Sequence, residues 1–282
     1  MGGTAAPWST VETLLCDLDG VVWLAHRPIP GSVDAIAQLR ATGRRVLFVT
    51  NNSASTRAQQ EHALARIGVP AVGDVVSSAM AAAWLVHPGE RVLVAGGPGV
   101  VEAVADRGAA VVINDGRGDP SGFDAVVVGL HRDFDYDRLA TASAAVRAGA
   151  RLIGTNSDST YPTPGGLEPG GGSILAAIAT AAGVSPVVAG KPHEPMAALI
   201  TGLIAGRMAD PANGFSSDCV AMVGDRTDTD GLFAQRLGCR FAVVRSGVPA
   251  AADDTVRVPV DLDAPDLAAV VARIVAGSER GQ

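Results

Sequence analysis

Four carboxylates follow, within a few residues, two short apolar segments that lie far apart in the chain. They are Asp17 and Asp19 after the first segment, and Asp225 and Asp230 after the second. Carboxylates that share one site repel one another unless a cation lies between them. No His or Cys pair accompanies them, and a ligand set made only of oxygen atoms is the one that Mg²⁺ prefers. The sequence therefore predicts a magnesium ion between the carboxylates of Asp17, Asp19 and Asp225, with Asp230 nearby.

Two further polar groups follow apolar segments in the same manner. One is the hydroxyl and amide group Thr50-Asn51-Asn52, and the other is Lys191. Lys191 is the only lysine among 22 Lys and Arg residues, which favours a position that requires a compact ammonium rather than a guanidinium. Three features together suit a phosphate group: a metal ion bound by carboxylates, a lysine ammonium and a hydroxyl group. The metal ion and the ammonium would both offset the negative charge of the phosphate during transfer.

These groups can meet because of the elements that carry them. Apolar segments rich in β-branched residues alternate with amphipathic ones, which predicts an α/β fold with a parallel sheet flanked by helices. The strands that would carry the polar groups are 13–16, 45–49, 187–189 and 220–223. The carboxyl ends of parallel strands lie at one edge of a sheet, so we expect all four groups to face one site. Each group taken alone could equally cap a helix.

Capping and breaking signals predict the remaining details. Ser32 is expected to cap a helix over 32–41, and 241–244 is predicted to be the last strand. Residues 156–172 contain three prolines and five glycines, which excludes a regular element there. A connection of this length inside a compact chain is expected to be functional or disordered.

Other phosphate-binding motifs are excluded by their local sequence. Gly190-Lys191 is followed by Pro192, whereas a Walker A loop has Ser or Thr at that position. The segment 97–102 lacks the third glycine of a dinucleotide-binding fingerprint. Cys16 has no Arg in the short loop behind it, so a thiol phosphatase is disfavoured and a carboxylate is the expected nucleophile.

The composition limits the class of protein. The 282 residues are 48% hydrophobic and 18% charged, which indicates a globular protein rather than a disordered chain. The net charge of −7 provides no positive field that would attract nucleic acid. The first residues do not resemble a signal peptide and no apolar stretch is long enough for a membrane span, so we expect a cytoplasmic protein without membrane association. The three cysteines form no spaced pair and are expected to be reduced and buried.

Four segments of the chain resemble the four motifs of the haloacid dehalogenase (HAD) superfamily of phosphatases, in the same order. They are Asp17-Leu18-Asp19-Gly20-Val21-Val22-Trp23, Thr50-Asn51-Asn52-Ser53, Gly190-Lys191-Pro192 and Gly224-Asp225-Arg226-Thr227-Asp228-Thr229-Asp230. The Thr-Asn-Asn form and the long interval before the lysine are similar to the subgroup with a C2-type cap. That subgroup includes NagD-like, phosphoglycolate, 4-nitrophenyl phosphate and pyridoxal phosphate phosphatases. The resemblance implies a Rossmann-like HAD core in residues 1–90 and 185–282, with an inserted α/β cap of the C2 type in residues 91–184.

The resemblance also implies roles for the acidic residues. Asp17 is the implied nucleophile and Asp19 the general acid and base, and Gly20 leaves room beside them. Mg²⁺ is implied to bind Asp17, the backbone carbonyl of Asp19, and Asp225, while Asp230 orients a coordinated water.

The remaining motif residues are implied to hold the substrate. Thr50 and the amide of Asn51 would bind the transferring phosphoryl group, and Asn52 would support their loop. Lys191 would bridge the phosphate and Asp17.

The cap is expected to fold over the site and exclude water. Its loop 156–172 is the part expected to reach the leaving group, with Tyr161 as the contact residue. Asn156 and Asp158 are predicted to shape that loop through hydrogen bonds to the backbone, and Asp228 to cap a helix. The cap could also join two copies of the chain as a homodimer.

The expected activity is Mg²⁺-dependent hydrolysis of a small phosphorylated metabolite through an aspartyl-phosphate. Glycerol 3-phosphate is the first candidate, and 2-phosphoglycolate, pyridoxal phosphate and nucleotide monophosphates are alternatives. A non-catalytic phosphate-binding or regulatory protein of the same fold is disfavoured by the intact set of Asp17, Asp19, Lys191 and Asp225. A dehalogenase is disfavoured because Asp19 and the pair Asp225 and Asp230 suit a metal-dependent phosphatase.

Overall fold

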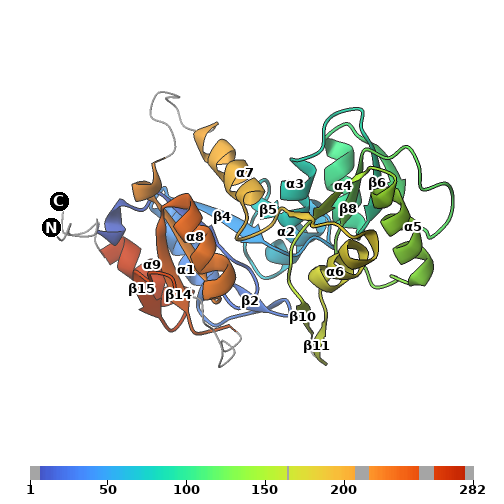
Figure 1. Cartoon of the computed structure of the whole chain (residues 1–282). Coiled ribbons are helices and arrows are strands. Elements are labelled where there is room, and N and C mark those ends of the chain that lie inside the picture. Colours follow the sequence, from blue (N-terminus) through green and yellow to red (C-terminus); the bar gives the residue numbers. More distant parts are fainter. Residues whose placement is uncertain (1–6, 164, 207–215, 248–256, 277–282) are drawn as a thin grey trace. The chain divides into compact units, whose positions relative to one another are not determined.

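The computed structural model describes residues 7–163, 165–206, 216–247 and 257–276. The chain divides into two compact units, each built on a parallel sheet with helices beside it (Figure 1). The first unit contains residues 1–49, 61–75 and 200–282, and the second contains residues 50–60 and 76–199. The predicted α/β fold with parallel sheets and flanking helices is confirmed.

The sheet of the first unit has six strands in the order β15-β14-β13-β1-β4-β5, of which β4 and β5 end in residues assigned to the second unit. Their bounds are β1 Thr13–Cys16, β4 Arg45–Thr50, β5 Val75–Ser77, β13 Val220–Gly224, β14 Arg240–Val244 and β15 Leu262–Ala264. β1 runs parallel to both β13 and β4, with Thr13 opposite Val220 and Arg45. All four residues of β1 are buried, as in a strand that is covered on both faces. β15 follows β14, the strand that the sequence predicts to be the last. The sequence does not reveal β15, because its three residues are too few to show an alternating apolar pattern.

The helices of the first unit each bury one face. Their bounds are α1 Ser32–Ala41, α8 Leu232–Leu237 and α9 Leu267–Ala276, while α2 Arg57–Arg66 and α7 Glu194–Ala205 contribute residues to both units. α9 buries Leu267, Val270, Val271 and Ile274. Spacings of three and four residues place these side chains on one side of the helix. They pack in a core that also contains Leu14 of β1 and Phe48 of β4.

The sheet of the second unit has five parallel strands in the order β12-β9-β8-β6-β7. The strands are β6 Arg91–Ala95, β7 Ala110–Ile113, β8 Ala125–Val128, β9 Arg151–Gly154 and β12 Val187–Val188, and the helices are α3 Ser78–Ala83, α4 Pro98–Asp106, α5 Tyr136–Arg147 and α6 Gly171–Ala182. Val126 of β8 and Ile178 of α6 share its core. Within the described ranges of both units, every helix is too short or too polar to cross a lipid bilayer.

A hairpin occupies part of the segment predicted to be irregular, so that prediction for 156–172 is wrong. Its strands are β10 Thr160–Thr163 and β11 Gly166–Pro169, which pair antiparallel. The N–H of Gly170 donates to the carbonyl of Ser159 at 2.9 Å, which makes this pair a hydrogen-bonded one. Such pairs alternate along the ladder, so Pro162 and Pro169 both fall in pairs that exchange no backbone hydrogen bond. The prolines therefore interrupt nothing in the hairpin.

A second hairpin follows β1 and leads into α1. It joins β2 Trp23–Leu24 to β3 Arg27–Pro28. Its turn residues Ala25 and His26 have φ angles of 49° and 63°, as in the turns that suit short hairpins. The bounds of α1 match the predicted helix, but Gly31 and not Ser32 is its N-cap. The Ser32 hydroxyl instead donates to the carbonyl of Val22 at 2.8 Å and ties the helix to this hairpin.

Candidate active site

Three carboxylates of the first unit lie together at the carboxyl ends of β1 and β13. Asp17, Asp225 and Asp230 each offer an oxygen, and these oxygens lie within 4.8 Å of one another. Asp17 directly follows β1, and its N–H donates to the carbonyl of Val223 at 3.0 Å. Asp225 directly follows β13, and Asp230 lies in the helical turn Thr227–Gly231. The pairing of two adjacent strands therefore brings together motifs that are distant in sequence.

Glycines border this cluster where a side chain would collide with it. A Cβ at Gly20 would lie 2.2 Å from Oδ2 of Asp225, and a Cβ at Gly247 would lie 1.9 Å from the same atom. A Cβ at Gly224 would lie 2.1 Å from Oδ2 of Asp230. Gly20 also has a φ of +84°, which glycine adopts without strain. The carboxylates can keep their places only because these three positions lack side chains.

The donor set fits a hard divalent cation. Asp230 is fully buried and Asp17 is only partly exposed, so water screens little of the repulsion within the cluster. All three groups are carboxylates, whose oxygens Mg²⁺ and Ca²⁺ bind in preference to softer ligands. The structure thus brings together the predicted ligands Asp17, Asp225 and Asp230.

Asp19 lies in a tight turn behind β1. The carbonyl of Leu18 accepts hydrogen bonds from the N–H groups of Val22 and Trp23, at 2.9 and 3.1 Å. The N–H of Gly20 donates to the carbonyl of Trp23 at 2.8 Å. Across this turn the indole Nε1–H of Trp23 donates to Oδ1 of Asp19 at 3.1 Å. The turn therefore holds the Asp19 carboxyl beside the Trp23 ring.

Asp228 lies in the first turn of the helical segment Thr227–Gly231, as expected of an acid near a helix start, but its side chain does not cap the backbone there. The turn has no side-chain cap. The carboxylate of Asp228 instead accepts two hydrogen bonds from the guanidinium of Arg226, at 3.0 and 2.7 Å. Arg226 and Asp228 are two residues apart in the chain, so the two side chains reach each other and form an ion pair.

Asn51 is the centre of a hydrogen-bond network in the second unit. Its side-chain Nδ2 donates to the carbonyl of Lys191 and to Oδ2 of Asp158, each at 3.1 Å. Its own carbonyl accepts from Oγ of Ser78 at 2.7 Å and from Nδ2 of Asn156 at 2.8 Å. Both N–H groups of the side-chain amide are used within the protein. A ligand contact from Asn51 is therefore expected from its backbone N–H.

Thr50 and Asn52 shape the loop that leaves β4. Oγ1 of Thr50 accepts from the N–H of Asn52 at 3.0 Å, and Oδ1 of Asn52 accepts from the N–H two residues further on, also at 3.0 Å. A Cβ at Gly190 would lie 2.6 Å from Oδ1 of Asn51, so glycine permits the close approach of the Lys191 segment. Thr50 and Lys191 are both buried. The structure thus gathers the second and third motifs within one unit.

Three members of this network are not predicted as site residues from the sequence. Asn156 and Asp158 are predicted only to shape their loop, and Oδ1 of Asn156 does accept from the N–H of Asp158 at 3.1 Å. Both side chains also bond to Asn51. Their position behind β9 indicates this role, since polar groups behind the other motif strands also belong to the site. Ser78, the first residue of α3, carries no comparable signal.

Tyr161 lies on the hairpin of the second unit, where it lines a cavity of about 300 Å³. The other lining residues are Leu130, His131, Arg132, Phe134, Glu168, Pro169 and Ile174. Arg132 and Glu168 form an ion pair beside mainly apolar walls. His131 bonds to Asp133 at 3.1 Å, and this hydrogen bond lowers the pKa of the Asp133 carboxyl. The cavity therefore offers both apolar surface and charge.

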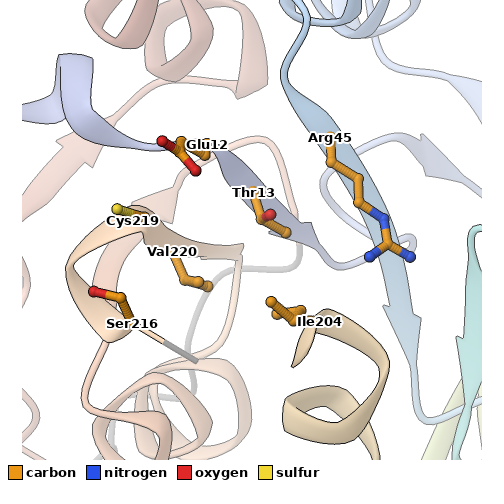
Figure 2. A pocket seen from close by; sticks show the side chains of 7 residues that line it. All are labelled: Glu12, Thr13, Arg45, Ile204, Ser216, Cys219 and Val220. Atoms are coloured by element: carbon orange, nitrogen blue, oxygen red, sulfur yellow. The ribbon is translucent and has the colours of Figure 1, made fainter. Parts of the chain in front are cut away.

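A second cavity, of about 150 Å³, lies at the edge of the first unit's sheet where β1, β4 and β13 begin (Figure 2). Thr13, Arg45 and Val220 line it, and they are the first residues of β1, β4 and β13. The carboxylates follow the last residues of β1 and β13, so this cavity is separate from the cluster.

The three cysteines carry free thiols, as expected for reduced residues. Cys16 is buried, as expected, whereas Cys219 and Cys239 are partly exposed as whole residues, although the thiol of Cys239 is largely buried. Burial of its sulfur raises the pKa of the Cys239 thiol to about 12, which keeps it protonated at neutral pH.

Sequence comparisons match both ends of the chain to one family. A profile described as "Haloacid dehalogenase-like hydrolase" matches residues 14–110, and a second profile, of HAD-hydrolase-like proteins, matches residues 188–270. The D-glycerol 3-phosphate phosphatase of Mycobacterium tuberculosis is 40% identical over 254 residues, which cover 88% of this chain and 67% of the relative. The acid sugar phosphatase of Staphylococcus aureus is 35% identical over 241 residues, which cover 84% of this chain and 87% of the relative.

Solved structures show the same similarity in three dimensions. A hypothetical protein from Pyrococcus horikoshii has a TM-score of 0.82 and 32% identity, covering 92% of this chain and 98% of that protein. The glycerol phosphate phosphatase of M. tuberculosis in complex with magnesium has a TM-score of 0.78 and 35% identity, covering 93% of this chain and 77% of that protein.

Proposed function

This chain belongs to the haloacid dehalogenase-like hydrolase family, and we propose that it hydrolyses a small phosphomonoester through an aspartyl-phosphate, with Mg²⁺ as its cofactor. It is a phosphoric monoester hydrolase, in keeping with the named phosphatases that it resembles. The observation that carries the proposal is the cluster of Asp17, Asp225 and Asp230 at the ends of β1 and β13. The fold is a Rossmann-like HAD core with a separate cap region.

The proposed metal ligands are the carboxylates of Asp17 and Asp225 and the backbone carbonyl of Asp19, with Asp230 orienting a coordinated water. When bound, the cation supplies positive charge that offsets the repulsion between the carboxylates and the substrate phosphate. The close, partly buried oxygens and the glycines around them support this assignment. The similar M. tuberculosis phosphatase has been solved with magnesium and also with calcium.

Asp17 is the proposed nucleophile. One of its oxygens forms a bond to phosphorus while the bond from phosphorus to the alcohol oxygen breaks. Asp19 gives that oxygen a proton, so the product leaves as a neutral alcohol. Asp19 then takes a proton from the water that attacks the aspartyl-phosphate, which releases phosphate and restores Asp17. Gly20 leaves room for the neighbouring Asp225, because a side chain at this position would collide with the Asp225 carboxylate.

The second and third motifs are proposed to bind the transferring phosphoryl group. The hydroxyl of Thr50 and the backbone N–H of Asn51 donate to its oxygens, and Lys191 adds a positive charge. Asn52 supports their loop through the hydrogen bond that its Oδ1 accepts from the N–H of Ala54. The network around Asn51 supports this role because donors that are already fixed need no reorganisation when charge develops in the transition state.

D-Glycerol 3-phosphate is the first proposed substrate, supported by the 40% identity to the M. tuberculosis phosphatase of that name. The alternatives are 2-phosphoglycolate, pyridoxal phosphate and nucleotide monophosphates. Tyr161 is proposed to contact the leaving group. Its place on a hairpin that lines a cavity with an ion pair supports a role in substrate choice.

The division into a core of residues 1–90 and 185–282 and a C2-type cap of residues 91–184 is part of this proposal. The sheet formed by β6, β7, β8 and β9 is the centre of the proposed cap. We also propose a homodimer through the cap, because β7 is an edge strand and its Ile113 is 61% exposed. Light scattering after size exclusion should give twice the chain mass, and Ile113→Lys should give the monomer.

A substrate panel tests the function. Phosphate release from the purified chain is measured with glycerol 3-phosphate, 2-phosphoglycolate, pyridoxal phosphate and nucleotide monophosphates, with and without Mg²⁺. We expect the highest kcat/KM for glycerol 3-phosphate and no turnover without the metal. Absence of release from every phosphomonoester would overturn the proposed function, while a higher value for another ester would overturn only the substrate.

A further inference from the structure

We propose that Trp23 is a positioning residue, which fixes the oxygen from which Asp19 delivers its proton to the leaving group. The inference rests on the proposed function, in which Asp19 is the general acid. It adds to that function a residue that acts through Asp19.

The contact is direct and both partners belong to the first unit. Nε1 of Trp23 lies 3.1 Å from Oδ1 of Asp19, within the usual range for a hydrogen bond. The N–H of Gly20 donates to the carbonyl of Trp23, and the N–H of Trp23 donates to the carbonyl of Leu18. These two backbone bonds close the turn between Asp19 and Trp23. The distance between indole and carboxyl is therefore set by the backbone.

The indole has little freedom to leave this position. Trp23 is only 2% exposed and packs in the core that contains Leu18 and Val22. One side of its ring meets the imidazole of His26 at a centroid distance of 4.8 Å and an angle of 61°. β2, which begins at Trp23, is paired with β3. A rotation of the ring would break core packing and the hairpin contact together.

The chemistry of the indole makes the two carboxyl oxygens of Asp19 unequal. An indole N–H can donate a hydrogen bond but cannot accept one. Oδ1 is therefore held as an acceptor, and the proton of the carboxylic acid is carried by Oδ2. As the bond from phosphorus to the alcohol oxygen breaks, this proton passes from Oδ2 to that oxygen. The same oxygen then takes the proton from the attacking water.

A purely structural role makes a different prediction. A core tryptophan that only fills space would, when replaced by Phe, reduce stability and slow all substrates by the same factor. A positioning role affects the step in which the leaving group needs a proton. Alkyl phosphates need that proton and activated aryl phosphates do not, because 4-nitrophenolate is a good leaving group.

A spectroscopic test detects the hydrogen bond without using activity. The chain contains three tryptophans, so a ¹H–¹⁵N spectrum of the Mg²⁺-loaded protein shows three indole signals, which Trp→Phe variants assign. In Asp19→Ala the indole proton of Trp23 should move upfield, while those of Trp8 and Trp84 stay in place. A Trp23 signal that does not move would overturn the proposal, whether or not the protein hydrolyses any substrate.

A kinetic test measures the consequence. Trp23→Phe should lower kcat for glycerol 3-phosphate by roughly 10- to 100-fold and for 4-nitrophenyl phosphate by less than about threefold, with KM nearly unchanged. Trp8→Phe is the matched control, because Trp8 is also buried in the same core. It should leave the ratio of the two rates unchanged. Equal losses on both substrates in Trp23→Phe would overturn the positioning role, whereas a wild-type protein inactive on both would overturn the proposed function instead.

Discussion

The N–H of Asp17 donates to the carbonyl of Val223 at 3.0 Å, so the ladder between β1 and β13 continues one residue beyond the end of β1. Asp225 lies two residues after Val223 on the neighbouring strand. The separation of the two carboxylates is therefore set by the central strands of the sheet. Substitutions of the two carboxylates should therefore change the chemistry and leave the fold intact.

Asp17→Asn should lower kcat by about 10³-fold or more, because an amide cannot act as the nucleophile. Asn preserves the side-chain volume, so the melting temperature measured by calorimetry should change little. Asp228→Asn is the control, since Asp228 is a partly exposed acid paired with Arg226, and it should retain nearly full kcat. A nearly normal rate in Asp17→Asn would show that another group attacks the phosphorus.

Metal binding should raise the melting temperature, because a cation that binds only the folded state stabilises it. We expect Mg²⁺ to raise the melting temperature of the wild-type chain and to have no such effect on Asp225→Asn. Chelation should abolish turnover, and Mg²⁺ should restore it. Ca²⁺ should bind but inhibit, because its larger and more flexible coordination shell disturbs the placement of Asp17. Turnover that persists in excess chelator would contradict the metal assignment.

Gly20→Ala and Gly43→Ala separate backbone strain from the collision with Asp225. Both glycines have a φ above +80°, so alanine should cost about 1–2 kcal/mol of folding free energy at either position. Only at Gly20 would the new Cβ lie 2.2 Å from Oδ2 of Asp225, whereas nothing lies within 4 Å at Gly43. Gly20→Ala should therefore also weaken Mg²⁺ affinity in a calorimetric titration. Equal Mg²⁺ affinities in the two variants would show that the cluster can move aside.

Lys191→Met should lower kcat by roughly 10²-fold, because the phosphoryl group loses a fixed positive charge. The carbonyl of Lys191, which accepts from Asn51, is kept in this variant, so the loop should keep its structure. Lys191→Arg should not restore the rate, because the planar guanidinium needs more room than an ammonium in this buried position. Full activity of the folded Met variant would make the lysine structural. The measurements are kcat and the melting temperature of each variant.

Tyr161→Ala should reduce kcat/KM for glycerol 3-phosphate more than for 4-nitrophenyl phosphate, because a small polar substrate depends more on contacts remote from the phosphorus. Tyr136→Ala is a suitable control, since Tyr136 is 80% exposed at the start of α5. Equal changes on both substrates would place substrate choice elsewhere in the chain.

The sequence predicts the strands that carry the motifs because their apolar residues and the polar residues behind them form local patterns. β1 ends at Cys16, as predicted, directly before Asp17, and β13 ends at Gly224, one residue later than predicted. The hairpin of β10 and β11 is not predicted, because its prolines suggest an irregular segment. Pro162 cannot donate a backbone hydrogen bond, but this disrupts a ladder only where the proline lies in a hydrogen-bonded cross-strand pair. Whether Pro162 lies in such a pair depends on the register of the partner strand, which the sequence does not specify.

The contacts of Asn51 could not be predicted for a different reason. Its partners Asp158 and Lys191 are more than a hundred residues away in the chain, and no local pattern encodes which carbonyl an amide will reach. The same holds for the collision that Gly247 avoids with Asp225. Residue types indicate the chemistry of the site, whereas these long-range distances require the folded structure.

The single lysine of this chain makes the protein suitable for selective chemical labelling. Lys191 carries the only side-chain amine and is 3% exposed. An amine-specific acylating reagent therefore has one side-chain target, and its rate of reaction at that target measures how often the buried position opens to solvent. Mass spectrometry can follow this opening in the unmodified wild-type sequence, without first replacing competing lysines.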